Sequence, residues 1–317
     1  MNKNVLLVGS GPMAIEYAKV LTSMNCNVIV VGRSKKNANE FFLKTNISVI
    51  EGGIDNWLIN NNPNVIDKTI VCVSENELDN VVISLIQKGF KDILVEKPAG
   101  LNIKNIKKLS DIVKKNNVKL FVGYNRRFYA SVNKALQIIN EDGGVTSFYF
   151  EFTEWSHVIK DLEKGVGVKE NWFLQNSTHI IDLAFYICGI PKDISSYCGG
   201  YLDWHPSASI FAGAGVSESG ALFNYQANWQ APGRWGIEVL TKNHRLIFRP
   251  IEKLHIQKIG SVAIDLVEID DKYDIEFKPG LYKEIEAYLN NDTSQFCMLD
   301  DLVKILPFYA KIANYEF

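Results

Sequence analysis

Residues 4–14 read NVLLVGSGPMA, and this stretch decides the fold class of the chain. Its first half is a short apolar run typical of a buried strand, and its second half is a glycine-rich turn that opens a helix. Gly9 permits the tight turn, Gly11 lets the backbone approach a pyrophosphate, and the small Ala14 lets the helix pack on the strand. Pro12 suits the first helical turn, where its missing donor costs little. The stretch therefore predicts a phosphate-binding loop and a helix whose N-terminus faces an anion.

Short apolar runs alternate with amphipathic stretches in the first part of the chain, which indicates a parallel sheet. Six such runs suit a doubly wound sheet with right-handed crossovers. We therefore expect an α/β fold, with a dinucleotide-binding Rossmann domain over residues 1–122. The runs cover residues 5–8, 28–31, 48–50, 69–73, 93–95 and 118–122.

The pattern changes after Tyr124. Phe148, Phe150 and Phe152 alternate with more polar neighbours, as in a half-buried strand, and a helical pattern follows around residues 172–188. We expect residues 123–317 to form a substrate-binding and oligomerisation domain of the α+β type, built on a mostly antiparallel open sheet. The pattern leaves open that the last helix packs back on the first domain. Further strand-like runs cover residues 221–230, 236–241, 245–248, 254–259 and 262–269, and helical patterns cover residues 281–289 and 299–313.

The composition excludes several classes of protein. The net charge is -2, and positive and negative residues are interspersed along the chain, so we expect no nucleic-acid partner. No apolar run approaches the ~20 residues of a membrane span, and the first residues lead into a strand pattern without a signal peptide. The five cysteines are odd in number and widely spaced, without a Cys-x-x-Cys motif. We therefore expect a cytoplasmic protein with reduced thiols, no metal site and no membrane contact.

The end of the second apolar run bears on the choice of cofactor. An NAD site usually has Asp or Glu there for the ribose 2′-hydroxyl, but this chain has none, and Arg33, Ser34 and Lys35 can meet a 2′-phosphate. We therefore favour NADP(H) as the cofactor. The alternative is that Arg33 is merely solvated and that the enzyme accepts both NADP(H) and NAD(H). The residues predicted to bind the cofactor are Gly9, Ser10, Gly11, Pro12, Met13, Arg33, Ser34, Lys35, Ser74 and Glu96.

A charged pair, Glu96 and Lys97, closes the buried run 93–95 and precedes Pro98. Charges at the end of a buried strand are costly unless they face a cleft. In an open parallel sheet, ligands bind in the crevice beyond the carboxyl ends of the strands. Lys97 is therefore a candidate for chemistry. The alternative is a structural role as a partner of Glu96 or of a helix terminus.

Four motifs, in this order, resemble those of the glucose–fructose oxidoreductase / inositol dehydrogenase / rhizopine-catabolism (Gfo/Idh/MocA) family. They occupy residues 9–14, 96–98, 124–128 and 178–182. The resemblance covers nearly the whole chain and implies hydride transfer at a sugar or cyclitol carbon. It also implies a second domain whose open sheet often builds dimers or tetramers, and it places Lys97 and His179 at the usual active-site positions. It further suggests a cis peptide bond before Pro98.

The chemistry of such a site follows from the side chains. Oxidation of a secondary alcohol requires removal of the hydroxyl proton as hydride leaves, and an imidazole such as His179 can take that proton and return it in reduction. The ammonium of Lys97 can stabilise negative charge that develops on the same oxygen. The alternative for His179 is a satisfied core residue, because Ile180, Ile181 and Leu183 surround it in the sequence.

One departure from the family pattern concerns Gln175, which stands where the family commonly has Asp, four residues before His179. Glutamine can hydrogen-bond an imidazole or a sugar hydroxyl but brings no charge. We expect Gln175 to position substrate and His179 to stay neutral to lower pH. For Asp182, capping, pairing and substrate contact stay open. The candidates for substrate contact are Tyr124, Arg126, Gln175 and Asp182, and packing is the alternative for Tyr124. One of Arg126 and Arg127 can bind a carboxylate or phosphate on the substrate, while the other forms a surface or interdomain pair.

The aromatic turn over residues 229–235 contains one arginine, Arg234, and favours core or interface packing over substrate binding. The leading hypothesis for function is an NADP(H)-dependent oxidoreductase acting on a sugar, sugar nucleotide or related polyol, assembled as a homodimer or homotetramer. The alternative is a catalytically weak, dinucleotide-binding regulator or sensor. A third hypothesis keeps the cofactor within a non-redox net reaction, such as glycoside hydrolysis through a transient ketone.

Overall fold

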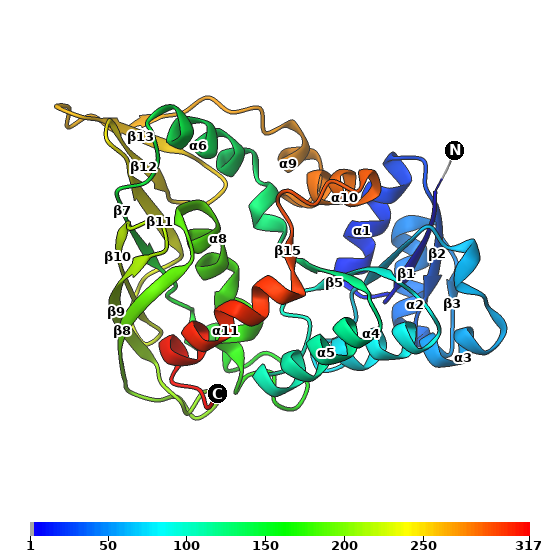
Figure 1. Cartoon of the computed structure of the whole chain (residues 1–317). Coiled ribbons are helices and arrows are strands. Elements are labelled where there is room, and N and C mark those ends of the chain that lie inside the picture. The colour runs from blue at the N-terminus through cyan, green and yellow to red at the C-terminus, as the bar shows by residue number, and fades with distance from the viewer. Residues whose placement is uncertain (1–2) are drawn as a thin grey trace. The chain divides into compact units, whose positions relative to one another are not determined.

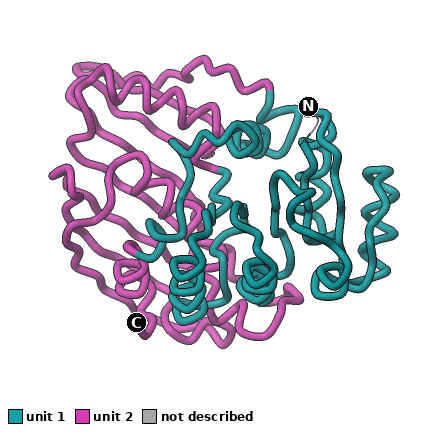
Figure 2. The backbone as a smooth tube through the Cα atoms, turned by 45° about the vertical axis from the view of Figure 1, so that its right-hand side comes forward, with its two compact units in different colours: residues 1–125, 273–303 teal, residues 126–272, 304–317 magenta. Residues whose placement is uncertain are grey.

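The structure is a computed structural model that describes residues 3–317, and it divides into two compact units (Figure 2). Unit 1 comprises Met1–Asn125 and Tyr273–Val303, and unit 2 comprises Arg126–Lys272 and Lys304–Phe317. The chain therefore leaves unit 1 after the sixth strand and returns to it near its end. Division into independently folding domains at residue 122 stays a prediction.

Unit 1 is built on a seven-stranded sheet in the order β15-β6-β5-β4-β1-β2-β3. The first six strands in the sequence are parallel, and β15 joins β6 antiparallel at one edge. The predicted Rossmann sheet is confirmed, because each predicted apolar run forms one of these six strands. The strands are β1 (Asn4–Val8), β2 (Asn27–Val31), β3 (Val49–Ile50), β4 (Lys68–Val71), β5 (Asp92–Glu96), β6 (Lys119–Gly123) and β15 (Cys297–Met298).

Helices cover both faces of this sheet (Figure 1). The longest of those in the first 125 residues, α5, begins where the side chain of Asn102 accepts a hydrogen bond from the backbone N–H of Asn105 at 3.0 Å. Ile106 and Leu109 bury its apolar stripe, while lysines fill the opposite side. The helices of unit 1 are α1 (Pro12–Ser23), α2 (Lys35–Thr45), α3 (Gly53–Asn60), a 3₁₀ turn at Pro63–Val65, α4 (Leu78–Gln87), α5 (Ile103–Lys115), α9 (Lys272–Glu276, but for its first residue) and α10 (Leu281–Asn290).

Unit 2 is built on an eight-stranded sheet in the order β14-β13-β12-β11-β7-β10-β9-β8. All neighbours are antiparallel except β7 and β10, which are parallel, so the predicted mostly antiparallel open sheet is confirmed. The strands are β7 (Ser147–Glu151), β8 (Pro191–Gly199), β9 (Ile210–Ser217), β10 (Leu222–Asn228), β11 (Gly236–Leu240), β12 (His244–Phe248), β13 (His255–Lys258) and β14 (Asp265–Leu266).

Two features of this sheet differ from the sequence-based expectation. Strands β8 and β9 were not predicted, because β9 contains small residues such as Gly213 and Gly215 in place of β-branched ones. A Cβ at Gly213 would lie 2.3 Å from the hydroxyl oxygen of Tyr225, so glycine there makes room for a ring of β10. The run 262–269 forms only the short β14, because Val262 and Leu266 are exposed and gain no packing.

The core of unit 2 lies between the sheet and α8, which covers one face (Figure 1). The Phe150 ring stacks on that of Tyr225 with centroids 5.3 Å apart, and Phe185 of α8 meets Phe150 edge-on at 5.3 Å. The predicted alternation over 148–153 therefore buries its aromatic face against this helix. The remaining helices are a 3₁₀ turn at Asn125–Phe128, α6 (Ala130–Glu141), α7 (Ser156–Ile159), a π turn at Phe173–Ser177, α8 (Thr178–Cys188) and α11 (Leu299–Ala313), whose first residues belong to unit 1.

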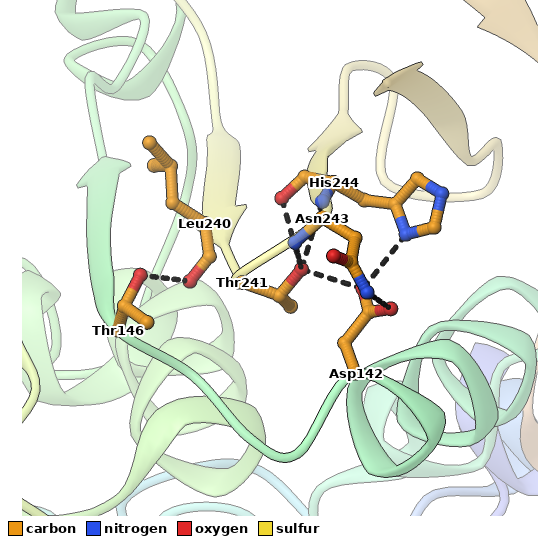
Figure 3. Close-up of polar contacts among 6 residues, drawn as sticks. All are labelled: Asp142, Thr146, Leu240, Thr241, Asn243 and His244. Carbon is orange, nitrogen blue, oxygen red and sulfur yellow. Dashed lines mark hydrogen bonds and ion pairs between the residues drawn. The ribbon is translucent and has the colours of Figure 1, made fainter. Parts of the chain in front are cut away.

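A polar cluster ties the end of α6 to the turn between β11 and β12 (Figure 3). Asp142 accepts hydrogen bonds from Thr241 Oγ1 at 2.6 Å and Asn243 Nδ2 at 2.8 Å, and its Oδ2 lies 2.7 Å from His244 Nδ1. Burial acts to raise the pKa of Asp142, but the hydrogen bonds outweigh it and hold that pKa below the ordinary value. The carboxylate therefore stays ionised at neutral pH and fixes the turn.

Within residues 3–317, no helix combines the length and the apolar character needed to cross a membrane. Over the same range, no three His, Cys, Asp or Glu side chains gather in a way that could hold a metal ion.

Candidate active site

The glycine-rich turn follows β1 with the geometry that a phosphate site requires. Gly9 has φ +128°, and a Cβ there would lie 2.4 Å from the carbonyl oxygen of Cys72, so only glycine fits. At Gly11, by contrast, a Cβ would meet nothing within 4 Å, so open space lies over this residue. Pro12 begins α1, and the first turn of that helix has no acidic residue. A helix N-terminus with open space before it suits an anionic pyrophosphate.

The residues after β2 present positive charge to solvent. The Arg33 side chain is 74% exposed and makes only a loose ion pair, 3.8 Å long, with Glu77. Ser34 caps α2 by accepting a weak hydrogen bond of 3.4 Å from the N–H of Asn37, and Lys35 is exposed in the first turn. Ser74, beyond the end of β4, is also exposed. An arginine held this loosely can turn to a phosphate at little cost.

Lys97 directly follows β5 and is half-buried, and the peptide bond before Pro98 is cis, as the resemblance suggests. β5 runs parallel to β4, and β4 runs parallel to β1. The Gly9–Gly11 turn and Lys97 therefore lie at the same carboxyl edge of one sheet, which is where open α/β sheets bind their ligands.

Two residues that the sequence did not point to, Tyr17 and Glu284, form a hydrogen-bonded cluster with Glu96. The hydroxyl of Tyr17 donates a hydrogen bond of 2.9 Å to Glu96 Oε1, and Glu284 Oε2 lies 3.4 Å from the same hydroxyl oxygen. Burial, together with the nearby charge of Glu96, raises the pKa of the fully buried Glu284 well above its ordinary value. The protonated form of Glu284 is therefore favoured, and the hydrogen-bonded cluster includes Glu96, the residue directly before Lys97.

His179 lies in the first turn of α8, directly after the π turn. It is half-buried, and its ring centroid lies 6.2 Å from that of Trp235. Gln175 lies inside the π turn and is only 3% exposed. Single π turns are frequent at functional sites, because the extra residue in the turn re-aims side chains. The sequence does not predict this π turn, whose position directly before His179 makes the segment a candidate functional site.

Glu154 brings a carboxyl group to this part of unit 2, where it contacts the two residues that follow Gln175. It follows the carboxyl end of β7 and is 1% exposed. Ser177 Oγ donates to it at 2.8 Å, Asn176 Nδ2 donates at 2.9 Å, and Arg234 lies 3.6 Å away. Burial raises the pKa of Glu154 to about 7, although the hydrogen bonds and Arg234 act to lower it. A charged residue at the end of the alternating apolar pattern over residues 148–153 was the sequence signal that could have found it.

Three other predicted substrate contacts have defined surroundings. Asp182 accepts two hydrogen bonds from Arg127, at 2.8 Å from Nε and 2.6 Å from Nη2, which favours pairing over substrate contact. Tyr124 is 1% exposed, which favours packing. Arg126 lies over the ring of Trp235, with 5.0 Å between its Cζ and the ring centroid. Within unit 2 the structure therefore brings Arg126, Trp235 and His179 together.

Glu154 should make stability depend on pH. Its pKa is about 7 in the folded chain against an ordinary 4.5, so the folded state holds a proton that the unfolded state loses between these values. Its contribution is therefore complete below pH 4.5 and is lost as pH rises through 7, by about 3 kcal/mol. Calorimetric or denaturant unfolding between pH 4.5 and 8 should show this fall, reduced in Glu154→Gln but kept in Glu218→Gln, at an exposed site. Equal slopes in native and Glu154→Gln proteins would contradict the assignment.

Comparison with known proteins agrees with this geometry. The family model described as "Oxidoreductase family, NAD-binding Rossmann fold" (Gfo/Idh/MocA) matches residues 3–124. The myo-inositol 2-dehydrogenase of Thermotoga maritima is 31% identical over 127 residues, which are 40% of this chain and only 37% of that relative. A candidate NADPH-dependent oxidoreductase from Desulfitobacterium hafniense has a TM-score of 0.80 at 16% identity, with 99% of this chain and 95% of that chain covered. Levoglucosan dehydrogenase, solved with NADH, has a TM-score of 0.76 at 18% identity, with 99% and 96% covered.

The glycine turn, the lysine at the same sheet edge and the open mixed sheet of unit 2 define an NAD(P)-binding α/β protein of two units. The structural likenesses extend this fold over 99% of the chain. Residues 3–124 of the chain match the model of the Gfo/Idh/MocA oxidoreductase family.

Proposed function

We propose that this protein is an NADP(H)-dependent oxidoreductase that transfers hydride to or from a CH–OH carbon of a sugar, sugar nucleotide or related polyol. The observation that carries the proposal is the shared edge of one parallel sheet, where the Gly9–Gly11 turn and Lys97 both follow strand ends. The relatives named above include dehydrogenases of inositol and levoglucosan, which supports a sugar-like substrate.

In this proposal Lys97 and His179 divide the chemistry at the reacting oxygen. The nicotinamide, when bound, accepts or supplies the hydride. In oxidation His179 takes the proton of the hydroxyl, and in reduction it returns a proton to the carbonyl oxygen. The ammonium of Lys97 holds that oxygen and stabilises its developing negative charge. Gln175 positions the substrate as a hydrogen-bonding group without charge.

The first residues of the chain would hold the cofactor. Gly9, Gly11 and the N-terminus of α1 bind the pyrophosphate, with Ser10, Pro12 and Met13 completing the turn. Glu96 and Ser74 belong to the same edge of the sheet and stay in the proposed set. Arg33, Ser34 and Lys35 bind the 2′-phosphate that distinguishes NADP(H) from NAD(H).

The preference for NADP(H) can be tested at Arg33. Arg33→Ala should raise the KM for NADPH roughly 10- to 100-fold, because a hydrogen bond to a charged group contributes about 1.5–3 kcal/mol. The KM for NADH should hardly change. Lys44→Ala removes a positive charge from the far end of α2, where Lys44 pairs with Glu40, and should leave both constants as in the native protein. A native preference for NADH would contradict the proposal.

The activity is tested by a screen of sugars, sugar nucleotides and polyols with each cofactor, followed by nicotinamide absorbance. The proposal expects a stoichiometric change in absorbance with at least one of them. The alternative is a dinucleotide-binding regulator, which the uncharged Gln175 at the position of the family acid keeps open. Tight cofactor binding without turnover on any compound would favour the regulator.

We further propose that the outer face of the unit 2 sheet joins copies of this chain. Leu240 of β11 and Leu222 of β10 lie in register on either side of Ser147, and Leu222 is 64% exposed. Tyr197 of β8 is also exposed, at 74%. Light scattering should give the mass of a dimer or tetramer, and Leu222→Asp should lower it, because a buried unpaired charge is costly. Val262→Asp, at an exposed site outside this face, should not; a monomeric native protein would refute the proposal.

A further inference from the structure

Two arginines meet at one indole in unit 2. The Cζ atoms of Arg126 and Arg234 lie 5.0 and 4.7 Å from the ring centroid of Trp235, so both guanidinium groups contact the same ring. The ring of His179 lies beside the same indole, with centroids 6.2 Å apart. Two permanent positive charges therefore border the residue that we propose as the catalytic base.

The positive charge at this place is only partly compensated. Within residues 3–317, Arg126 is half-buried and makes neither a hydrogen bond nor an ion pair with any side chain or carbonyl group. Arg234 has Glu154 as an ion-pair partner at 3.6 Å, but burial raises the pKa of that carboxyl to about 7, so it is often neutral at physiological pH. The adjacent Arg127, by contrast, is bound by both carboxylate oxygens of Asp182.

A second donor at the same place also lacks an acceptor. Trp235 is only 6% exposed, and its Nε1 finds no hydrogen-bond partner among the residues that the structure describes. Buried indole N–H groups normally have a partner, which an incoming ligand can supply. The guanidinium of Arg126, with five donors, and the buried indole N–H of Trp235 therefore both lack an acceptor oxygen in the described part of the chain.

We propose that Arg126, assisted by Arg234, binds an oxyanion carried by the substrate, so that this enzyme acts on acidic or phosphorylated sugars rather than on neutral ones. The inference rests on the proposed function, because it places the charged substituent beside His179. Carboxylate and phosphate share the chemistry that a guanidinium fork recognises, namely two oxygens in one plane with negative charge. A neutral sugar offers hydroxyl oxygens but leaves the two positive charges without a counter-charge.

The test compares hexuronates and hexose phosphates with their parent hexoses, by calorimetric titration of the full chain in the presence of NADP(H). We expect an anionic probe to bind roughly 10- to 100-fold more tightly than its neutral parent, because hydrogen bonds between charged groups are the strong ones. Added salt should reduce this advantage. Whether the uronates or the phosphates gain more distinguishes carboxylate from phosphate.

Two variants make the test specific to this site. Arg126→Gln should abolish the advantage of the anionic probe over its neutral parent, while Arg126→Lys should keep part of that advantage, because lysine keeps the charge but loses the fork. Arg245→Gln removes an arginine that pairs with Glu238 elsewhere in unit 2 and should behave as the native protein. Equal binding of anionic and neutral probes, no binding of any anionic probe, or an advantage that survives Arg126→Gln overturns the inference.

The outcomes also separate this inference from the proposed function. Hydride transfer from neutral sugars without any preference for charged ones would refute the anion site but would support the proposed oxidoreductase activity. Tight binding of an anionic probe that is lost in Arg126→Gln, but never accompanied by a change in nicotinamide absorbance, supports the anion site and counts against the enzyme.

Discussion

His179→Ala is expected to lower kcat roughly 10²- to 10⁴-fold, the range that a positioned general acid–base group contributes. Affinity for the dinucleotide should not change, because the phosphate loop and Arg33 lie in unit 1 and are untouched. The variant should keep its fold, because His179 is half-buried at the start of α8 and does not fill the aromatic core. Steady-state kinetics and dinucleotide titration on the same preparation check both statements.

Three comparisons sharpen this experiment. His157→Ala removes an exposed histidine from α7 of the same unit and should leave kcat as it is. Added imidazole should restore part of the activity of His179→Ala, since only the proton carrier is missing. Lys97→Met should lower kcat as well, and the double variant should lose less than the product of the two single losses, because groups that act as a unit are not additive. A His179→Ala protein with native kcat would refute the catalytic role.

The sequence predicts unit 1 better than unit 2 for a physical reason. In unit 1 the central strands β1, β4 and β5 are buried on both faces and read as apolar runs, such as residues 5–8 and 93–95, separated by helices with clear periodicity. In unit 2 the pleat of β9 holds Gly213 and Gly215 under aromatic rings of β10. The sequence of β9 alone therefore lacks the apolar alternation that indicates a strand, because the large side chains that pack at Gly213 and Gly215 belong to β10.

Some residues of the candidate site could likewise be predicted from the sequence, and others could not. The glycine turn and Lys97 follow strand ends directly, so local sequence reveals them. Glu284 reaches Tyr17, and Arg126 reaches Trp235, from segments far apart in the chain, so no local pattern contains these contacts. The aromatic turn over residues 229–235 was expected mainly to pack; the buried Trp235 does so, but it also carries two guanidinium groups on its ring.

The pair of Arg127 and Asp182 supports the prediction with the largest effect on stability. Their side chains are 13% and 4% exposed, and the guanidinium meets both carboxylate oxygens. Asp182→Asn keeps the shape but takes the negative charge from beside a largely buried cation, which typically costs about 3–5 kcal/mol of the free energy of unfolding. Denaturant unfolding of the native protein and the variant measures this loss. A loss no larger than that of an ordinary surface substitution would contradict a buried ion pair.

The double variant Arg127→Met/Asp182→Leu distinguishes pairing from substrate contact. Replacing both charges by apolar side chains of similar volume removes the desolvation penalty together with the attraction, so most of the stability lost in Asp182→Asn should return. If Asp182 serves the fold alone, the stable double variant should also recover the native KM for substrate, because α8 again holds His179 in place. A double variant that is as stable as the native protein but has a strongly raised KM would show instead that Asp182 touches the substrate.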